Sequence, residues 1–91
     1  MIQKVVCVEN RLGLHARAAA KLVRVASQYS SQINLSREGG SREIDAKSIL
    51  GILMLAAPRG VRLVISIDGQ DEAEAVEAIR RLFEDKFGEE S

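Results

Sequence analysis

Four short apolar segments predict β-strands, mainly because apolar residues alternate with polar ones and so fall on one face. The clearest alternation spans residues 61–67. Residues 2–8 form a short run rich in valine, which favours strands, and residues 32–37 alternate as well. The pair Gly39-Gly40 then predicts a hairpin whose second strand covers residues 41–45.

The segments between these strands carry apolar residues at the spacing of amphipathic helices. We expect the first helix over residues 16–29, the second over 49–56 and the third over 71–87. Ser48 is a suitable N-cap for the second helix, and the breaker sequence at 58–60 ends it. The apolar positions of the first and third helices are Ala19, Leu22, Val23 and Ala26, and Val76, Ile79 and Phe83.

The resulting order is βαββαβα within 91 residues, which is enough for one small domain over 1–91. Strands with a single apolar face suit an antiparallel sheet that is covered on one side. We therefore predict an α+β fold, an open-faced two-layer sandwich whose four-stranded antiparallel sheet carries three helices on one face. The end of the chain, 88–91, is expected to fray.

Composition narrows the possible functions and partners. The formal net charge is zero and aromatic residues make up 3% of the chain, which argues against nucleic acid, since basic surfaces and stacking rings carry that binding. Cys7 is the only cysteine, so no internal disulfide forms, and the histidine and cysteine content argues against a metal site. No run approaches membrane-spanning length and no signal-peptide pattern is present. We expect a cytoplasmic monomer with no cofactor and no membrane insertion.

The only histidine, His15, provides the candidate chemistry. It follows the turn signal Gly13 and precedes the first predicted helix, so its imidazole lies at or beside a helix N-terminus. Such a terminus attracts anions, phosphate above all, through its unpaired amides and its dipole. Arg17 adds an always-charged phosphate partner, and the amides of Ala16, Arg17 and Ala18 are candidate phosphate contacts. A surface or capping role is the simpler interpretation of a lone histidine there.

Two separated segments resemble the HPr family, the histidine phosphocarriers of the bacterial sugar phosphotransferase system. The first is Gly13-Leu14-His15-Ala16-Arg17 followed by Ala19-Ala20-Lys21-Leu22-Val23, which resembles the family's active-site signature. The second is Asp45-Ala46-Lys47-Ser48-Ile49-Leu50-Gly51-Ile52-Leu53, which resembles its regulatory serine segment. Residues 61–68 and 69–73 are similar to its last strand and the start of its last helix, so the resemblance covers nearly the whole chain.

The resemblance implies a carrier that turns over only with partner enzymes and is not an enzyme by itself. His15 would accept a phosphoryl group from enzyme I charged by phosphoenolpyruvate, on Nδ1 as in the family, and pass it to sugar-specific enzyme IIA domains. Ala18 stands where the family usually has proline. Because proline has no N–H, alanine adds a backbone donor, which we expect to point at His15 or its phosphate.

The second segment implies regulation and docking. Ser48 matches the serine that HPr kinase/phosphorylase modifies in some bacteria, and an ordinary N-cap role is the alternative. Burial in the core is the alternative interpretation of the apolar residues that follow Ser48. The residues that match the family's partner-docking surface are Ala20, Arg24, Ile49, Leu50 and Leu53.

Two other functions fit the same residues. One is an HPr-like carrier in a nitrogen-related or other regulatory phosphorelay, and the other is a non-catalytic regulatory interaction protein in which His15 is a relic. An independent hydrolase fits poorly, because no second histidine, carboxylate motif or metal set accompanies His15.

Overall fold

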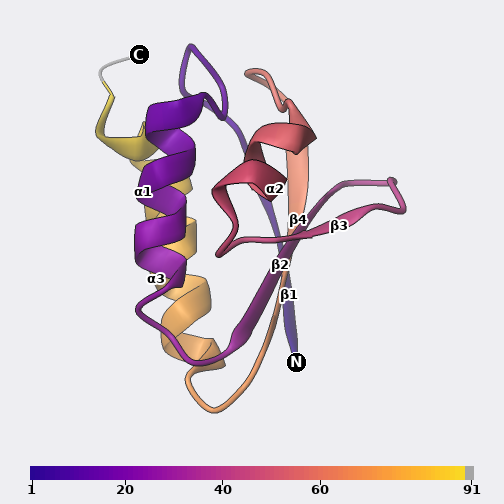
Figure 1. Cartoon of the computed structure of the whole chain (residues 1–91), viewed down its shortest axis with the longest axis vertical. Helices are drawn as coiled ribbons and strands as arrows, with labels where there is room; N and C mark the ends of the chain where they lie inside the picture. Colours follow the sequence, from indigo (N-terminus) through magenta and orange to yellow (C-terminus); the bar gives the residue numbers. More distant parts are fainter. Residues whose placement is uncertain (90–91) are drawn as a thin grey trace.

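A computed structural model of the chain describes residues 1–89 and shows one sheet with helices against it (Figure 1). The strands form the order β1-β4-β2-β3, and each neighbouring pair is antiparallel. Within residues 1–89, no helix has the length and apolar character needed to cross a bilayer. The elements are β1 (Ile2–Cys7), α1 (Ala16–Ala26), β2 (Gln32–Arg37), β3 (Glu43–Asp45), α2 (Ile49–Leu55), β4 (Arg62–Asp68), α3 (Glu72–Glu84) and the 3-10 helix η1 (Lys86–Gly88).

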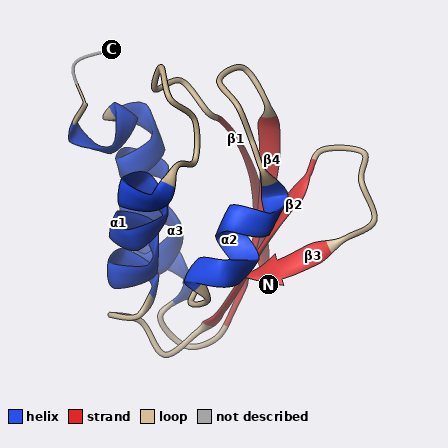
Figure 2. Cartoon of the chain, turned by 45° about the horizontal axis from the view of Figure 1, so that its top comes forward, coloured by secondary structure: helices blue, strands red, loops and turns tan. Residues whose placement is uncertain are grey.

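All three α-helices lie over the same face of the sheet, with α1 and α3 side by side and α2 next to α1 (Figures 1 and 2). The central strand β4 supplies Leu63, Ile65 and Ile67 to the core, all fully buried. The register places Ile65 opposite Leu35 and Ile67 opposite Ile33 of β2. The predicted α+β open-faced sandwich of order βαββαβα is thus confirmed. The buried apolar side chains of α1 and α3 include Ala19, Leu22, Ala26, Val76, Ile79 and Phe83.

Most element boundaries lie close to the predicted ones, but α1, β3 and α3 are each shorter by two or more residues. α1 ends at Ala26 instead of 29, and the amides of Gln28 and Tyr29 bond to carbonyls three residues back in tight turns. β3 covers Glu43–Asp45 instead of 41–45, because pairing with β2 begins only at Glu43. β2 has its predicted bounds, and β1, α2 and β4 agree to within one residue at each end.

The third helix differs most from its prediction, because α3 stops at Glu84 instead of continuing to residue 87. Lys86 and Phe87 adopt left-handed φ values of 53° and 57°. The turn still buries the Phe87 ring, which packs edge-on against Phe83 with 4.9 Å between ring centroids. Lys21 Nζ of α1 donates a hydrogen bond to the Phe87 carbonyl at 2.6 Å. This hydrogen bond holds the turn that follows α3 against α1.

The predicted tail starts with two residues that have defined positions. Gly88 closes η1, and Glu89 reaches the beginning of α1, beside which the yellow end of the ribbon lies in Figure 1. Residues 90–91, the rest of the segment expected to fray, lie outside the described residues.

A carboxylate fastens the α1–β2 loop to the start of α3. Asp71, at the N-cap of α3, accepts hydrogen bonds from the Ser30 amide at 2.8 Å and the Ser31 amide at 3.0 Å, and the Ser31 hydroxyl donates to it as well. These donors, the Ser31 hydroxyl foremost, lower the pKa of Asp71 to about 2. The Asp71 carboxylate therefore links the α1–β2 loop to the start of α3. This link lies near the C-terminal end of α1, whereas His15 lies at its N-terminal end.

Asp71→Asn is expected to lower the melting temperature at pH 7 and to do so less in acid. A carboxyl group whose pKa is lower in the folded state contributes stability above its unfolded pKa, and that contribution is lost as the pH falls through the folded value of about 2. The gap in melting temperature between the two proteins should thus close between about pH 4 and pH 2. Ser30→Ala, which keeps both amide donors, is the mild control. A gap that is constant over this range would contradict the role of the charge.

Candidate functional site

The loop before α1 has a backbone shape that glycine alone fits. Gly13 has a φ of 69°, and a Cβ added there would lie 2.5 Å from the Ala57 carbonyl oxygen and 2.9 Å from Pro58 Cα. The Gly13 amide donates to the Asn10 carbonyl at 3.1 Å, and the next amide, that of Leu14, donates to the Ala57 carbonyl at 3.0 Å. Glycine is therefore required at position 13 because the backbone there passes close to Ala57 and Pro58, and the turn that it forms leads directly to His15.

His15 is the N-cap of α1, as its position after the turn predicts. Its backbone is extended, its carbonyl accepts the first helical hydrogen bond from Ala19 at 2.8 Å, and its Nδ1 accepts from the Arg17 amide at 3.2 Å. The side chain is 26% exposed, so the ring is partly open to a docking partner. The amide that reaches the imidazole belongs to Arg17, whereas the expectation named Ala18, whose side chain is fully buried in the core.

The other ring nitrogen of His15 faces a carboxylate from the end of the chain. Nε2 lies 2.6 Å from Glu89 Oε2, and Asn10 Nδ2 donates to Glu89 Oε1 at 3.2 Å. The hydrogen bond from His15 is the main reason that the pKa of Glu89 is lowered. Because Nδ1 accepts from an amide and Nε2 faces a carboxylate, we assign the proton to Nε2 and the ring lone pair to Nδ1.

A hollow open to solvent lies at this histidine, and two arginines are among the residues that line it. Arg11 and Arg17 line it together with Leu12, Ala16 and the carboxylate of Glu89. Guanidinium groups and the N-terminal amides of α1 are donors that suit phosphate. An imidazole with an available lone pair supplies a nucleophile. The arrangement therefore has what a transient phosphoryl group needs, which is an attacking atom and donors for its oxygens.

The sequence pattern points to only part of this site. His15, Ala16 and Arg17 lie within the five-residue signature 13–17, and the structure brings them together as expected. Glu89 lies 74 positions away from His15 and Asn10 lies in a polar loop, so neither belongs to any local pattern. The long-range contact depends on the left-handed turn after α3, which residue spacing does not reveal.

Ser48 is the N-cap of α2, as expected. Its Oγ accepts a hydrogen bond from the Gly51 amide at 3.1 Å. The other end of α2 is held from β2, because the Arg37 guanidinium donates to the carbonyls of Leu55 at 2.9 Å and Ala56 at 3.0 Å. Both ends of this short helix are therefore capped by side chains.

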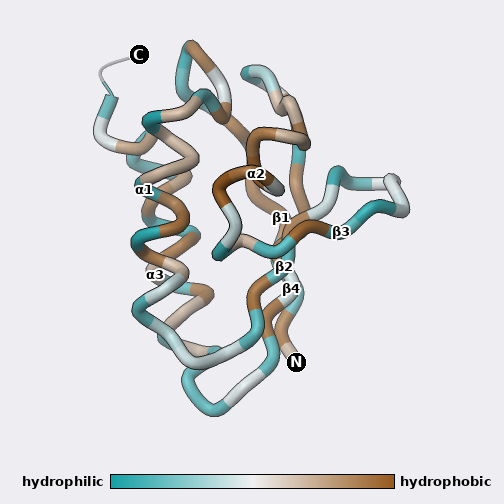
Figure 3. Tube along the Cα trace, in the orientation of Figure 1, coloured by the Kyte–Doolittle hydropathy of each residue, from teal (hydrophilic) through white to brown (hydrophobic). Residues whose placement is uncertain are grey.

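The outer side of α2 is apolar and exposed, and Figure 3 shows hydrophobic colour along most of this helix. Ile52 faces the core and is fully buried. Of the expected docking residues on α1, Ala20 is half-buried and Arg24 is exposed. Leu12, beside His15, and Met54 extend the apolar surface, and the sequence analysis did not single them out. The exposed fractions are 44% for Ile49, 67% for Leu50, 38% for Leu53, 52% for Met54 and 62% for Leu12.

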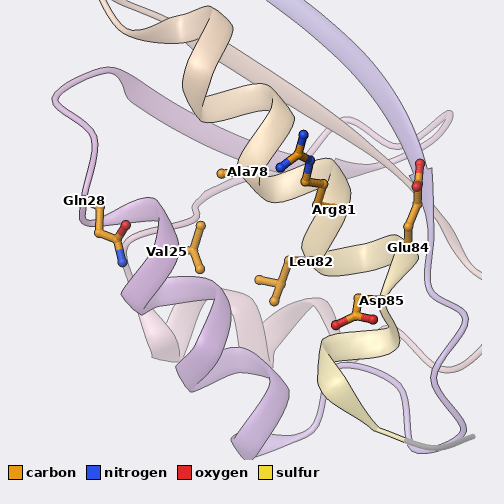
Figure 4. Close-up of a pocket in the computed structure, with 7 residues that line it drawn as sticks. All are labelled: Val25, Gln28, Ala78, Arg81, Leu82, Glu84 and Asp85. Carbon is orange, nitrogen blue, oxygen red and sulfur yellow. The ribbon is translucent and has the colours of Figure 1, made fainter.

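A second groove runs between α1 and α3 and has a different character (Figure 4). Val25 of α1 and Leu82 of α3 face the space between the two helices, and Arg81 and Glu84 flank it. Its mixed charges and apolar floor include no nucleophile comparable to His15. The chemistry of the molecule therefore concentrates at the N-terminus of α1.

Comparison with known proteins agrees with this geometry. A family model described as the PTS HPr component phosphorylation site matches residues 2–85. The chain belongs to the HPr family. The HPr phosphocarrier of Cupriavidus necator is 47% identical over 98% of both chains, and that of Xylella fastidiosa is 46% identical over the full length of both.

Solved HPr structures share the fold. The crystal structure of HPr-C-His from Thermoanaerobacter tengcongensis superposes with a TM-score of 0.93 at 42% identity over the whole of both chains. An HPr dimer from the same organism gives a TM-score of 0.76 at 42% identity, covering 98% of this chain and all of that one. As an HPr protein, the chain is a phosphocarrier component of the bacterial phosphotransferase system, which serves sugar transport.

Proposed function

We propose that this HPr protein carries a phosphoryl group on Nδ1 of His15, taking it from enzyme I charged by phosphoenolpyruvate and giving it to sugar-specific enzyme IIA domains. The observation that supports this most is the placement of Nδ1: it lies at the N-cap of α1, 3.2 Å from the Arg17 amide, in a hollow lined by Arg11 and Arg17. Family membership supports the partners.

The transfer step needs only one bond formed and one broken. The Nδ1 lone pair attacks the phosphorus of the donor's phosphoryl group, and the bond from phosphorus to the donor breaks with its electron pair left on the donor. Nδ1 can then no longer accept from the Arg17 amide, which becomes free to bond a phosphoryl oxygen. The amide of the exposed Ala16 can do the same, whereas Ala18 is fully buried. The ring becomes positively charged while its proton stays on Nε2. Passing the group to the acceptor reverses these changes.

The experiment combines the purified protein with enzyme I and labelled phosphoenolpyruvate. We expect one acid-labile and alkali-stable phosphoryl group per chain, followed by loss of the label when an enzyme IIA domain is added. An acceptor of the sugar branch and one of a nitrogen-related branch, compared at equal concentration, distinguish the two systems. A protein that stays unlabelled with an active enzyme I would refute the proposal.

Docking in this proposal uses the exposed apolar side of α2 together with Leu12 and the basic residues Arg17 and Arg24. An apolar centre with a charged rim suits short-lived complexes, because the charges speed association while the small apolar area permits rapid release. The protein acts as a monomer in these complexes. Sedimentation at working concentration tests this, since one related HPr has been crystallised as a dimer.

Ser48 is proposed as a regulatory site for HPr kinase/phosphorylase, and a charge placed there should weaken docking. Ser48→Asp is expected to keep the fold, because aspartate is also a good N-cap. It should slow phosphorylation of His15 by roughly tenfold at sub-saturating concentration, because a carboxylate enters the apolar docking surface. Ser48→Ala is the control, which loses about 1 kcal/mol of capping stability and leaves docking intact. Equal rates for Ser48→Asp and wild type would remove this role.

A further inference from the structure

Asn10 is a buried polar residue close to the candidate site. Its side chain is fully buried, and its Nδ2 donates to the Gly13 carbonyl at 2.7 Å and to Glu89 Oε1 at 3.2 Å. Among the buried side-chain polar atoms of residues 1–89, Asn10 Oδ1 is the only one without a hydrogen-bond partner. An unpaired buried carbonyl destabilises a fold. Such groups are retained mostly where a specific geometry is required.

We propose that Asn10 is a positioning residue for phosphoryl transfer, which acts through Glu89 to hold the His15 imidazole with its proton on Nε2 and its lone pair on Nδ1. This inference rests on the proposed function. It assigns a role to Asn10 and Glu89, which lie outside the signature around His15.

The orientation of the Asn10 amide is fixed by its surroundings. Both Nδ2 contacts, the Gly13 carbonyl and Glu89 Oε1, are acceptors. A flipped amide would place an oxygen against two other oxygens, so only the observed orientation satisfies them. The Gly13 carbonyl also accepts from the His15 amide at 2.9 Å. Asn10 thereby holds the turn that precedes His15 and also one oxygen of the Glu89 carboxylate.

Glu89 passes this constraint to the ring. With Oε1 held by Asn10, Oε2 lies 2.6 Å from His15 Nε2, and the carboxylate is only 18% exposed. A carboxylate on one imidazole nitrogen fixes the tautomer and the ring orientation and stabilises the positive charge that develops when the other nitrogen reacts. Glu89 lies at Nε2, whereas the phosphoryl group would be attached to Nδ1 on the other side of the ring. The carboxylate is therefore close to the positive charge of the imidazole and farther from the negative phosphoryl oxygens.

The end of the chain is built to bring Glu89 there. The buried ring of Phe87 anchors the left-handed turn, and the Lys21 ammonium holds the carbonyl of the same residue at 2.6 Å. Lys21 also contributes to lowering the pKa of Glu89, after the hydrogen bonds from His15 and Asn10. The carboxylate is therefore ionised at neutral pH and held within reach of the ring.

The first test needs no partner protein. In the wild type, NMR should show the His15 Nε2 proton shifted downfield and exchanging slowly, as expected for a short hydrogen bond to a carboxylate. Glu89→Ala should abolish this signal, and Asn10→Ala and Asn10→Asp should weaken it. An Nε2 proton signal that is the same in wild type and Glu89→Ala would overturn the proposal.

The second test measures phosphorylation by enzyme I. Asn10→Asp is expected to lower the maximal rate by about tenfold through misplacement of the ring, with the KM for the carrier unchanged because Asn10 is buried. Ser31→Ala is the matched control, because it also removes a buried polar group but does so at the far end of α1. An equal loss of rate in Ser31→Ala would show that Asn10 acts only through stability. If Asn10 variants fail to fold, Glu89→Ala and Glu89→Gln must show the rate loss instead.

The two tests separate the failure of this inference from the failure of the proposed function. If the wild type is not phosphorylated, the proposed function is wrong, while the NMR signal still reports whether Asn10 and Glu89 position the ring. If the wild type is phosphorylated and the Asn10 and Glu89 variants match it in maximal rate, the positioning role is wrong and the carrier function stands.

Discussion

His15→Ala is expected to reduce labelling by enzyme I and phosphoenolpyruvate to background, a loss of at least about a thousandfold, since the attacking atom itself is removed. His15 is the only histidine in the chain, so no other imidazole can take over the phosphoryl group. The amides and arginines of the hollow would remain, but they bind phosphate without forming a bond to it. The measurement is the amount of acid-labile label per chain after a fixed time.

The control for this variant must separate chemistry from capping. His15 caps α1 through Nδ1, so alanine also costs about 0.5–2 kcal/mol of stability. His15→Asn restores a good N-cap, and its denaturant midpoint should lie nearer to that of the wild type. Both variants should stay unlabelled. Labelling of His15→Asn at the wild-type rate would mean that another residue accepts the group.

Phe87→Ala is expected to produce the largest loss of stability, about 3–5 kcal/mol, because a nearly fully buried phenyl ring is removed and a cavity remains. The edge-on contact with Phe83 disappears as well. Since this ring anchors the turn that carries Glu89, the variant should also lose the Nε2 proton signal of His15. This single substitution, far from His15 in the sequence, would then lower the stability of the fold and also remove the hydrogen bond at His15 Nε2.

The measurements for Phe87→Ala are the urea midpoint and the NMR spectrum of His15 under folding conditions. Phe87→Leu is the matched control, because it keeps an apolar side chain in the same place and should retain most of the stability and the signal. An unchanged midpoint in Phe87→Ala would mean that the turn after α3 contributes little to the fold.

The third helix shows why part of this fold lies beyond sequence reasoning. Phe87 continues the spacing of Phe83, so a longer helix was a reasonable prediction. The structure buries the same ring through a left-handed turn instead. A continued helix and a left-handed turn can both place the Phe87 side chain in the core. The spacing of apolar residues predicts that the side chain is buried, but it does not distinguish between these two backbone conformations.

Part of the candidate site could likewise be predicted from the sequence and part could not. The glycine turn, the N-cap histidine and Ser48 are local features whose positions follow from short-range rules, and the structure places all three as predicted. Glu89 reaches His15 and Asn10 only after the sheet and helices have assembled. Their roles depend on tertiary contacts, which the sequence pattern contains no signal for.

The atom of His15 that carries the phosphoryl group is identified by NMR of the protein with nitrogen-15-labelled histidine after phosphorylation by enzyme I. We expect one phosphoryl group, with coupling between phosphorus and Nδ1 of His15 and the proton retained on Nε2. A phosphoryl group on Nε2, on another residue, or on no residue of a folded protein treated with active enzyme I would contradict this expectation.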